Sequence, residues 1–355
     1  MEVCDVILGG KANALGIARA LGGKASRIDL VHVEERAPAA RSRYVKRAIR
    51  YDVTREHLAA LLHSTCITPA ILYPTSDYWL EQLVTAFDDL PEDRFLFFRI
   101  PPKILSSFLD KLEFYRHFAG RFPIPETIEW DENGRKGFVT KPRRSFHGAN
   151  CIPKGFRQAR VDIPSELLVQ QRFVPAPLHH HYSVSGVAVA GRIAACLLTR
   201  KLLEHPTPGG TATLVALIDE VETGMQLRRL CEEFLAETSY SGPFELEVVA
   251  DDAQLWIIEF NARFWLQHTL GLKCGVNFPL LYRSLLLGTE APVAEVHPPF
   301  KAVWIHEGVA VSLLKTNFRQ AVAALRAIWQ ARVREFAHFR LDDPRPLLQI
   351  LRCPA

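Results

Sequence analysis

Residues 244–264, FELEVVADDAQLWIIEFNARF, constrain the fold of this 355-residue chain more than any other stretch. β-Branched and aromatic residues fill 244–249 and 255–260, and a polar connection at 251–254 separates them. This pattern predicts two antiparallel strands joined by a turn.

Acidic side chains recur at alternate positions along both predicted strands. Strand alternation places Glu245 with Glu247 on one face of the first strand, and Ile257 with Glu259 on one face of the second. Asn261 shares the face of Glu259 if the second strand continues that far.

Glu247, Glu259 and Asn261 could therefore converge as three oxygen donors, a set that suits a hard cation such as Mg²⁺. Arg263 has the same parity and would place a fixed positive charge beside that metal. The alternative is the solvated face of an ordinary hairpin, on which Glu and Arg are common.

Composition indicates an ordinary globular protein of two or three domains, with 48% hydrophobic and 23% charged residues. The net charge of +4 is small and dispersed, which argues against a nucleic-acid partner. The densest basic cluster, residues 41–50, is interpreted as the solvated face of a helix. Seven scattered cysteines without a CxxC pair argue against disulfides and zinc and for a reducing compartment.

The beginning of the chain, MEVCDVILGG, lacks an apolar run of signal length, and no stretch approaches the length needed to span a bilayer. We therefore expect a cytoplasmic protein without a membrane partner.

The first hundred residues predict a small α/β domain. An apolar strand at 3–8, a glycine-rich turn at 9–16 and a helix after it form a Rossmann-like unit without a dinucleotide fingerprint. Asp77 follows the predicted strand 70–73, so it lies at the carboxyl edge of a parallel sheet, where ligands bind. It could equally be the N-cap of the helix after it.

The middle of the chain contains further candidate binding residues. Lys111 lies on a predicted helix at 106–118, and Lys141 ends a predicted strand, from which it could contact a phosphate or simply reach water. A strand at 166–174 runs into the proline-rich hinge 175–177. The run 179–181 is three consecutive histidines, which lack the spacing of a structural metal site and are interpreted as an exposed loop.

Taken in order, the segments FLDKLEFY, FVTKPRRS, LLVQQRFV, LLTRKLLEHPTPGGTATLV, GPFELEVV and IIEFNARF resemble the ATP-grasp superfamily of ADP-forming ligases. Among its subfamilies, the chain looks most like the stand-alone carboxylate–amine ligases related to D-aspartate ligase. The resemblance implies a mixed α/β and α+β fold, in which a Rossmann-like N-terminal domain (1–104) precedes a two-lobed ATP-grasp domain (105–290). The lobes would span about 105–175 and 176–290, and 291–355 would be a C-terminal extension that packs on the grasp.

The resemblance also implies roles for individual residues. Phosphate contacts would come from Lys111, Lys141 and Lys201, beneath a mobile loop that contains Ser145, His147 and Gly148. The adenine edge would meet the backbone of the strand and hinge at Gln170, Gln171, Arg172, Phe173 and Val174. Glu247, Glu259 and Asn261 would hold Mg²⁺, with Mn²⁺ as a substitute, and Arg263 would stabilise the transferring phosphoryl group.

Two departures from the family pattern concern these contacts. Relatives usually place an acidic residue after the hinge to bind the ribose, whereas this chain offers histidines there, of which His181 is the candidate. Glu245 stands where some relatives have a basic residue.

The implied activity is ATP-dependent conversion of a small-molecule carboxylate to an acylphosphate, followed by attack of an amine. Two alternatives remain: an ATP-grasp carboxylase or kinase-like enzyme with a different acceptor, and a non-catalytic nucleotide-binding scaffold. A homodimer is the default assembly. The sequence does not identify the acid, the amine, the pathway or the role of the C-terminal extension.

Overall fold

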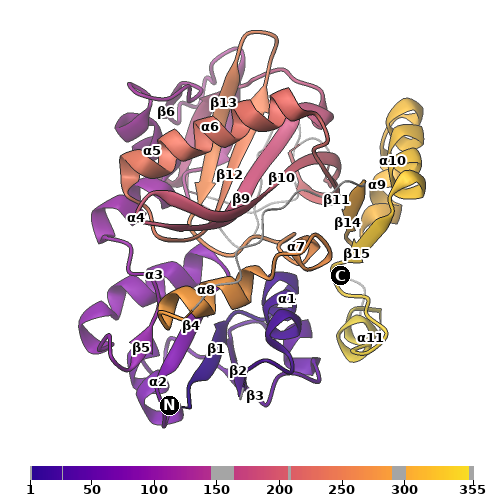
Figure 1. Cartoon of the computed structure of the whole chain (residues 1–355). Helices are drawn as coiled ribbons and strands as arrows, with labels where there is room; N and C mark the ends of the chain where they lie inside the picture. Colours follow the sequence, from indigo (N-terminus) through magenta and orange to yellow (C-terminus); the bar gives the residue numbers. More distant parts are fainter. Residues whose placement is uncertain (1, 26, 145–163, 207–208, 290–300, 352–355) are drawn as a thin grey trace.

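The computed structural model describes residues 2–25, 27–144, 164–206, 209–289 and 301–351. In these residues the chain forms three β-sheets with five, three and seven strands (Figure 1). The five-stranded sheet forms the lower body of the molecule, and the seven-stranded sheet lies above it (Figure 1). The expected mixed α/β and α+β architecture is therefore confirmed.

The N-terminal sheet is parallel, with strand order β3-β2-β1-β4-β5. Its strands are β1 Cys4–Leu8, β2 Ile28–His32, β3 Arg47–Arg50, β4 Ala70–Pro74 and β5 Phe95–Leu96. Helices α1 Ala12–Leu21, α2 Leu58–Thr65 and α3 Asp77–Thr85 accompany it. The helix expected over 41–50 is wrong, because Arg47–Arg50 forms edge strand β3, from which Arg47 donates to the buried Asp29 of β2 at 2.8 Å.

The strand-to-helix turn after β1 packs tightly against the rest of the N-terminal sheet. Gly9 has a positive φ of 130°, and an added Cβ would lie only 2.0 Å from the Thr75 hydroxyl. Glycine therefore lets the chain pass directly against the end of β4.

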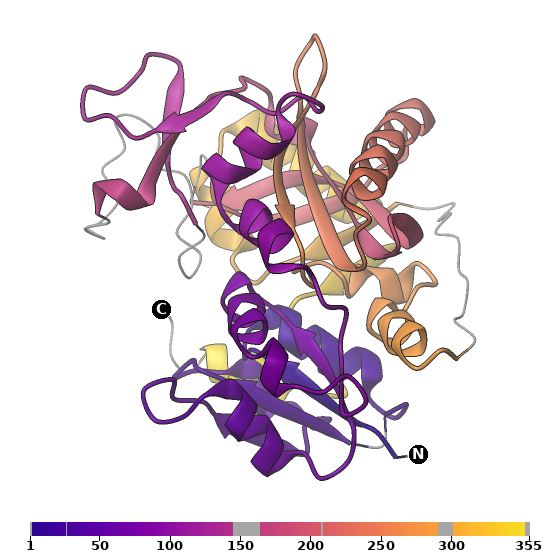
Figure 2. The same ribbon diagram turned by 90° about the vertical axis from the view of Figure 1, so that its left-hand side faces the viewer.

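A small three-stranded sheet, in the order β6-β8-β7, projects from the rest of the molecule (Figure 2). It contains β6 Thr127–Glu129, β7 Phe138–Pro142 and β8 Leu168–Arg172. The chain reaches it through α4 Pro102–Leu109 and α5 Lys111–Phe118.

The single helix expected over 106–118 is interrupted at Asp110. This residue is extended (φ −110°, ψ 113°), and its side chain accepts hydrogen bonds from the backbone N–H groups of Leu112 and Glu113. Asp110 is thus the N-cap of α5, a role that apolar periodicity does not reveal. Lys111 consequently begins a helix instead of lying within one.

The large sheet has the strand order β13-β12-β9-β10-β11-β14-β15. Its strands are β9 His181–Val189, β10 Arg192–His205, β11 Thr211–Leu217, β12 Gly242–Ala250, β13 Leu255–Asn261, β14 Ala302–Ile305 and β15 Val333–Phe336. Helix α6 Val221–Thr238 crosses one face (Figure 1), where Phe234 packs with Phe108, Phe118 and Phe260. The predicted antiparallel hairpin of β12 and β13 is confirmed.

The register of that hairpin corrects one expected face. Glu247 pairs with Glu259, but the next residue, Val248, pairs with Ile257, so Ile258 is an extra residue in β13. This bulge turns Ile257 to the opposite face, where it is fully buried beside Phe260 and Val248. Glu259 and Ile257 therefore do not share a face.

The last part of the chain connects both bodies. β14 and β15 extend the large sheet, while Asp343, beyond them, accepts a hydrogen bond from the buried Arg19 of α1 at 3.0 Å. The boundaries at 104/105 and 290/291 stay predictions, although the sheet continues across the second one.

The remaining helices are α7 Leu270–Lys273, α8 Phe278–Leu286, α9 Val309–Lys315, α10 Phe318–Gln330 and α11 Arg345–Leu351. Short 3₁₀ turns occupy Pro38–Arg41, Phe87–Asp89, Ser165–Leu167 and Leu178–His180.

No helix in the described ranges is both long enough and apolar enough to cross a membrane.

Candidate active site

Four polar side chains of β12 and β13 form an acidic cluster on the face opposite α6. Glu245 pairs with Asn261 across the two strands, and Glu247 pairs with Glu259. The Asn261 amide nitrogen donates to Glu245 Oε2 and to Glu247 Oε1, each at 3.3 Å. Asn261 therefore links the two carboxylates of β12, and the cross-strand register brings Glu259 beside them.

Two cations from other elements hold this cluster. Lys111, at the start of α5, places its Nζ 3.2 Å from Glu259 Oε1. Arg263, just beyond β13, donates from its Nη2 atom to Asn261 Oδ1 at 2.9 Å and from Nε to Asp77 Oδ1 at 2.8 Å.

The contact between Arg263 and Asp77 crosses from the large sheet to the N-terminal domain. Asp77 is the first residue of α3, and the N-cap of that helix is Ser76. The expected capping role of Asp77 is therefore wrong, and its carboxylate instead positions Arg263. A carboxylate in the first turn is also stabilised by the helix dipole.

Lys141 reaches the same region from the small sheet. Its Nζ donates to Gln171 Oε1 at 2.7 Å, and the Gln171 amide nitrogen donates to Thr127 at 3.1 Å. Lys141 is 7% exposed, so Gln171 fixes a buried ammonium group. The Lys141 charge also acts on the acidic cluster, because together with Lys111 it outweighs burial and lowers the pKa of Glu259.

Lys201 of β10 completes the set of cations. Its Nζ lies 3.4 Å from both Glu204 Oε2 and the Gly210 carbonyl. Strand alternation alone would separate Lys201 and Glu204, which are three residues apart. Register shifts between residues 201 and 204 bring both side chains to one side.

Burial and neighbouring charges shift the pKa values of the three glutamates in opposite directions. Burial, reinforced by the neighbouring Glu247 carboxylate, raises the pKa of Glu245 to about 8. Burial also raises the pKa of Glu247, although the Lys201 ammonium group opposes it. Burial would raise the pKa of Glu259 too, but the Lys111 and Lys141 charges outweigh it and lower that pKa.

Burial likewise would lower the pKa of Lys201, but Glu247 and Glu204 outweigh it and raise that pKa. Lys201 thus stays charged, while burial and the neighbouring carboxylates raise the pKa values of Glu245 and Glu247.

The predicted adenine contacts stay predictions. The Arg172 and Phe173 N–H groups donate to the Glu126 and Gly137 carbonyls at 2.8 Å. The side chain of Gln170 is also committed, to the backbone of Asp131 and Arg135. No backbone bond among the described residues uses the Val174 N–H group.

His181 lies at the start of β9, near both Lys201 and Lys141. Burial first, and then the Lys201 charge, lower the pKa of His181 to about 4. The imidazole is therefore neutral at pH 7. It retains the capacity to hydrogen-bond a hydroxyl group. Ser145, His147 and Gly148 lie outside the described residues.

Sequence reasoning assigned no contact within the site to three side chains: Glu245, Gln171 as a holder of Lys141, and Glu204. The parity of Glu245 with Glu247 was a signal for the first. The second depends on the pairing of β7 with β8, and the third on the irregular register of β10, neither of which a local pattern contains.

The donor chemistry of the acidic cluster fits Mg²⁺. Glu247, Glu259 and the Asn261 carbonyl are hard oxygen donors on adjacent strands. The raised pKa values of Glu245 and Glu247 reflect carboxylate charge that a divalent cation would offset.

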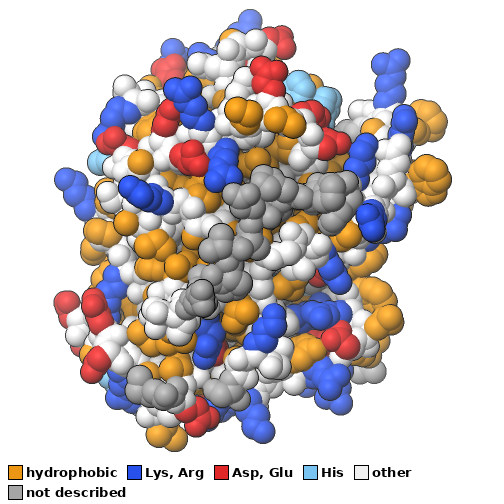
Figure 3. Space-filling view, in the orientation of Figure 1, with side chains coloured by type: hydrophobic (Ala, Val, Ile, Leu, Met, Phe, Trp, Pro, Cys, Tyr) orange, Lys and Arg blue, Asp and Glu red, His pale blue; other side chains and the backbone are white. Residues whose placement is uncertain are grey.

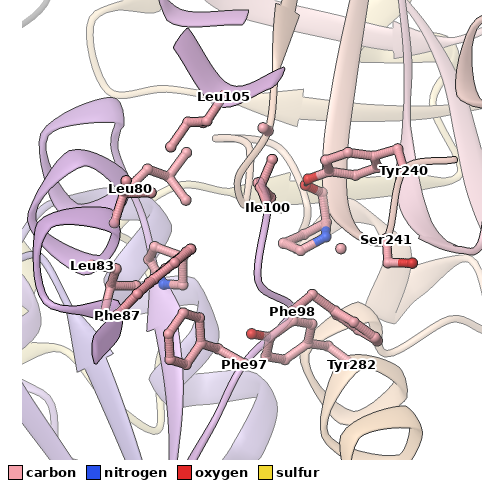
Figure 4. Close-up of a pocket in the computed structure, with 15 residues that line it drawn as sticks. Leu80, Leu83, Phe87, Phe97, Phe98, Ile100, Leu105, Tyr240, Ser241 and Tyr282 are labelled. Carbon is pink, nitrogen blue, oxygen red and sulfur yellow. The ribbon is translucent and has the colours of Figure 1, made fainter. Parts of the chain in front are cut away.

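Two other features of the structure do not offer this chemistry. An apolar pocket lies between α3, the 97–100 segment and the large sheet (Figure 4). Its polar groups are the hydroxyls of Tyr240 and Tyr282, which bond backbone carbonyls at 2.8 and 2.9 Å, and Ser241, which bonds Ala190.

The second feature is a group of three side chains, His306, Glu307 and His338, whose potential ligand atoms lie within 4.8 Å of one another. Glu307 is already bonded to His338 and to two backbone N–H groups. The Nδ1 lone pair of His306 accepts a hydrogen bond from the Gly308 N–H group. These bonds account for the group without a metal.

Residues 108–265, which contain most of these side chains, match the family profile described as the ATP-grasp domain. This part of the chain is an ATP-grasp domain. None of the curated proteins compared with it gives a significant match.

Solved structures share this ATP-grasp fold at low sequence identity. N5-carboxyaminoimidazole synthetase from Staphylococcus aureus is 14% identical with a TM-score of 0.66, and the match covers 89% of this chain and 86% of that one. L-amino acid ligase from Bacillus licheniformis is 13% identical with a TM-score of 0.61, and the match covers 84% and 78%. The biotin carboxylase domain of 2-oxoglutarate carboxylase from Hydrogenobacter thermophilus is 13% identical with a TM-score of 0.61, and the match covers 84% and 73%.

The pKa of Glu245 generates a prediction about stability. In the folded chain the Glu245 carboxyl group has a pKa of about 8, against an ordinary value of 4.5. Its contribution to the free energy of unfolding is therefore complete below about pH 4.5 and is lost as the pH rises through about 8. Glu245→Gln cannot lose a proton, so the free energy of unfolding of the wild type should fall relative to this variant between about pH 5 and pH 9.

Denaturant unfolding across this pH range measures the difference. Glu233→Gln, on the exposed side of α6, is the matched control and should follow the wild type. A difference between wild type and Glu245→Gln that stays constant with pH would contradict the burial of an ionisable carboxyl group in the cluster.

Proposed function

We propose that this chain is an ATP- and Mg²⁺-dependent enzyme that activates a carboxylate as an acylphosphate and joins it to an amine. The observation that supports this most is the convergence of cations on the paired acidic residues of β12 and β13. Lys111, Lys141 and Lys201 come from three separate elements, and all act electrostatically on Glu247 or Glu259.

The chemistry explains why such a set is needed. A carboxylate is a poor electrophile because oxide would have to leave, and phosphorylation supplies a better leaving group. The protein contributes chiefly position and charge neutralisation in this kind of transfer. A nucleophilic side chain is not required.

Each group of residues has a role in this proposal. Glu247, Glu259 and Asn261 would hold Mg²⁺, which, when bound, neutralises phosphate charge. Lys111 and Lys141 would exchange their contacts with Glu259 and Gln171 for phosphate oxygens. Lys201 would neutralise the terminal phosphate, and Arg263 would stabilise charge on the group in transfer.

The nucleotide base would meet the Val174 N–H group, and His181 would offer its imidazole to the ribose. The His181 assignment takes the place of the acidic ribose contact that relatives usually have. The narrower likeness to D-aspartate ligase, the use of Mn²⁺ and a homodimer stay predictions.

A second candidate is a carboxylase-like reaction, because the similar solved structures include carboxyaminoimidazole synthetases and a biotin carboxylase domain. The activated acid would then be bicarbonate, and the acceptor would again be a nitrogen atom. Dependence of turnover on bicarbonate separates the two candidates.

The test is ADP release by the purified chain with Mg²⁺, ATP and pairs drawn from small carboxylates, bicarbonate and amines. ADP and phosphate should rise together only when an acid and an amine are both present. Glu259→Gln should abolish the rise, because it removes a charge that both a metal and Lys111 use, whereas Glu233→Gln should not. ATP binding without turnover for any pair would favour the scaffold alternative.

Asp77 gives a more specific prediction for the turnover rate. Asp77→Asn removes the charge that holds Arg263 but keeps the side-chain shape. We expect kcat to fall by roughly tenfold, as for loss of one charged hydrogen bond, with little change in the KM for ATP.

The matched control is Glu81→Gln, one turn along α3, which loses only an exposed pair with Arg144. Equal effects of Asp77→Asn and Glu81→Gln would mean that Arg263 is positioned without the N-terminal domain.

A further inference from the structure

Helix α10 exposes an apolar stripe that the proposed reaction does not use. Phe318, Val322, Leu325 and Trp329 are 82%, 47%, 53% and 80% exposed. They occupy positions i, i+4, i+7 and i+11 and therefore follow one face of the helix. Leu314, near the end of α9, is 87% exposed beside this helix.

The helix is held to the molecule by its other side. Ala324 is buried with Leu203 and Leu214 of the large sheet, and Ile328 packs against the same cluster. The stripe is thus not an unpacked core face, and the fold presents it outward. Helix α10 has 13 residues and is about 20 Å long.

The charges beside the stripe are all positive. Residues 308–334 contain no Asp or Glu, and Lys315, Arg319 and Arg326 are exposed on α9 and α10. None of these three forms an ion pair with any residue that the structure describes. In Figure 3 blue and orange side chains project together from the right edge, where α10 lies.

Helix α6 shows what an ordinary solvated helix of this chain looks like. It also exposes two large apolar residues, Val221 and Met225. However, its Arg228 and Arg229 are each paired one turn on, with Glu232 and Glu233 at 2.9 Å. The positive charge of α10 has no such compensation within the helix, so it favours an external anion.

The exposed apolar surface extends beyond α10 on one side of the molecule. Of the fifteen strongly exposed large apolar side chains in the described chain, ten lie between residues 311 and 351. Figures 1 and 2 both place α10 and α11 on the same side, and α11 contributes Leu348 and Leu351. Such a surface suits a broad partner surface better than a partner that offers a small pocket or a single groove.

A second copy of the chain fits this surface poorly. In an antiparallel two-fold contact the stripes of two α10 helices would meet, and the Arg319 and Arg326 flanks of both copies would lie on the same side. Like charges would then approach with no acidic group between them.

We propose that the face formed by α9 and α10 binds the surface of an anionic membrane. Aromatic residues at both ends of an apolar stripe, flanked by Lys and Arg, are typical of helices that lie in the lipid interface. The helix would insert Phe318 and Trp329 among the headgroups, while Arg319 and Arg326 contact lipid phosphates. This departs from the expectation of no membrane partner, which rested on the lack of a spanning segment. An interfacial helix does not need one. The inference is independent of the proposed reaction.

Co-sedimentation of the full chain with phosphatidylcholine vesicles, with and without about one third phosphatidylserine, tests the proposal. The chain should bind only the anionic vesicles and should be released as salt is raised. Arg319→Gln with Arg326→Gln should weaken binding roughly twenty- to thirtyfold, at about fivefold per basic residue. Phe318→Ser with Trp329→Ser should abolish it.

Matched pairs on α6, Arg228→Gln with Arg229→Gln and Val221→Ser with Met225→Ser, should bind as the wild type does. The thermal unfolding midpoint checks that each variant is folded, and all the substituted side chains are exposed. Absent or equal binding to both vesicle types would overturn the proposal. A dimer in light scattering that Phe318→Ser with Trp329→Ser converts to monomers would also overturn it, in favour of a second copy.

Discussion

The cross-strand pairing of Glu247 with Glu259, and of Glu245 with Asn261, is the constraint on which the site depends. It places three carboxylates on one sheet face, where burial makes their charges costly. The fold accepts this cost only because cations arrive from elsewhere: Lys111 from the start of α5, Lys141 from the small sheet and Arg263 from beyond β13. A surface hairpin would need none of them.

This electrostatic balance also ties the parts of the chain together. Arg263 joins β13 to Asp77 of the N-terminal domain, and Asp110 caps α5 while accepting from Arg143 at 2.7 Å beside the small sheet. Elements that contribute charge to the site are therefore also those that fix the sheets relative to one another. A ligand that replaces Glu259 or Gln171 as the partner of Lys111 or Lys141 would act on these same connections.

The sequence was sufficient for the hairpin, because alternation over six residues is a strong local signal and β12 and β13 are consecutive. It failed at Ile257, since a single extra residue reverses the face and the pattern does not contain the bulge. It also failed at residues 41–50, where basic residues on an edge strand have the composition of a solvated helix. Contacts between distant segments, such as Arg263 with Asp77 or Lys201 with Glu204, required the three-dimensional register, and the family resemblance supplied roles for residues rather than their partners.

Calorimetric titration of the chain with ADP, in the presence and absence of Mg²⁺, tests the central claim most directly. If the acidic cluster is a metal–nucleotide site, ADP should bind with Mg²⁺ and bind at least about tenfold more weakly without it, and Glu259→Gln should remove the difference. Binding that does not depend on Mg²⁺, or that Glu259→Gln leaves unchanged, would contradict the assignment of β12 and β13 as the metal-binding strands.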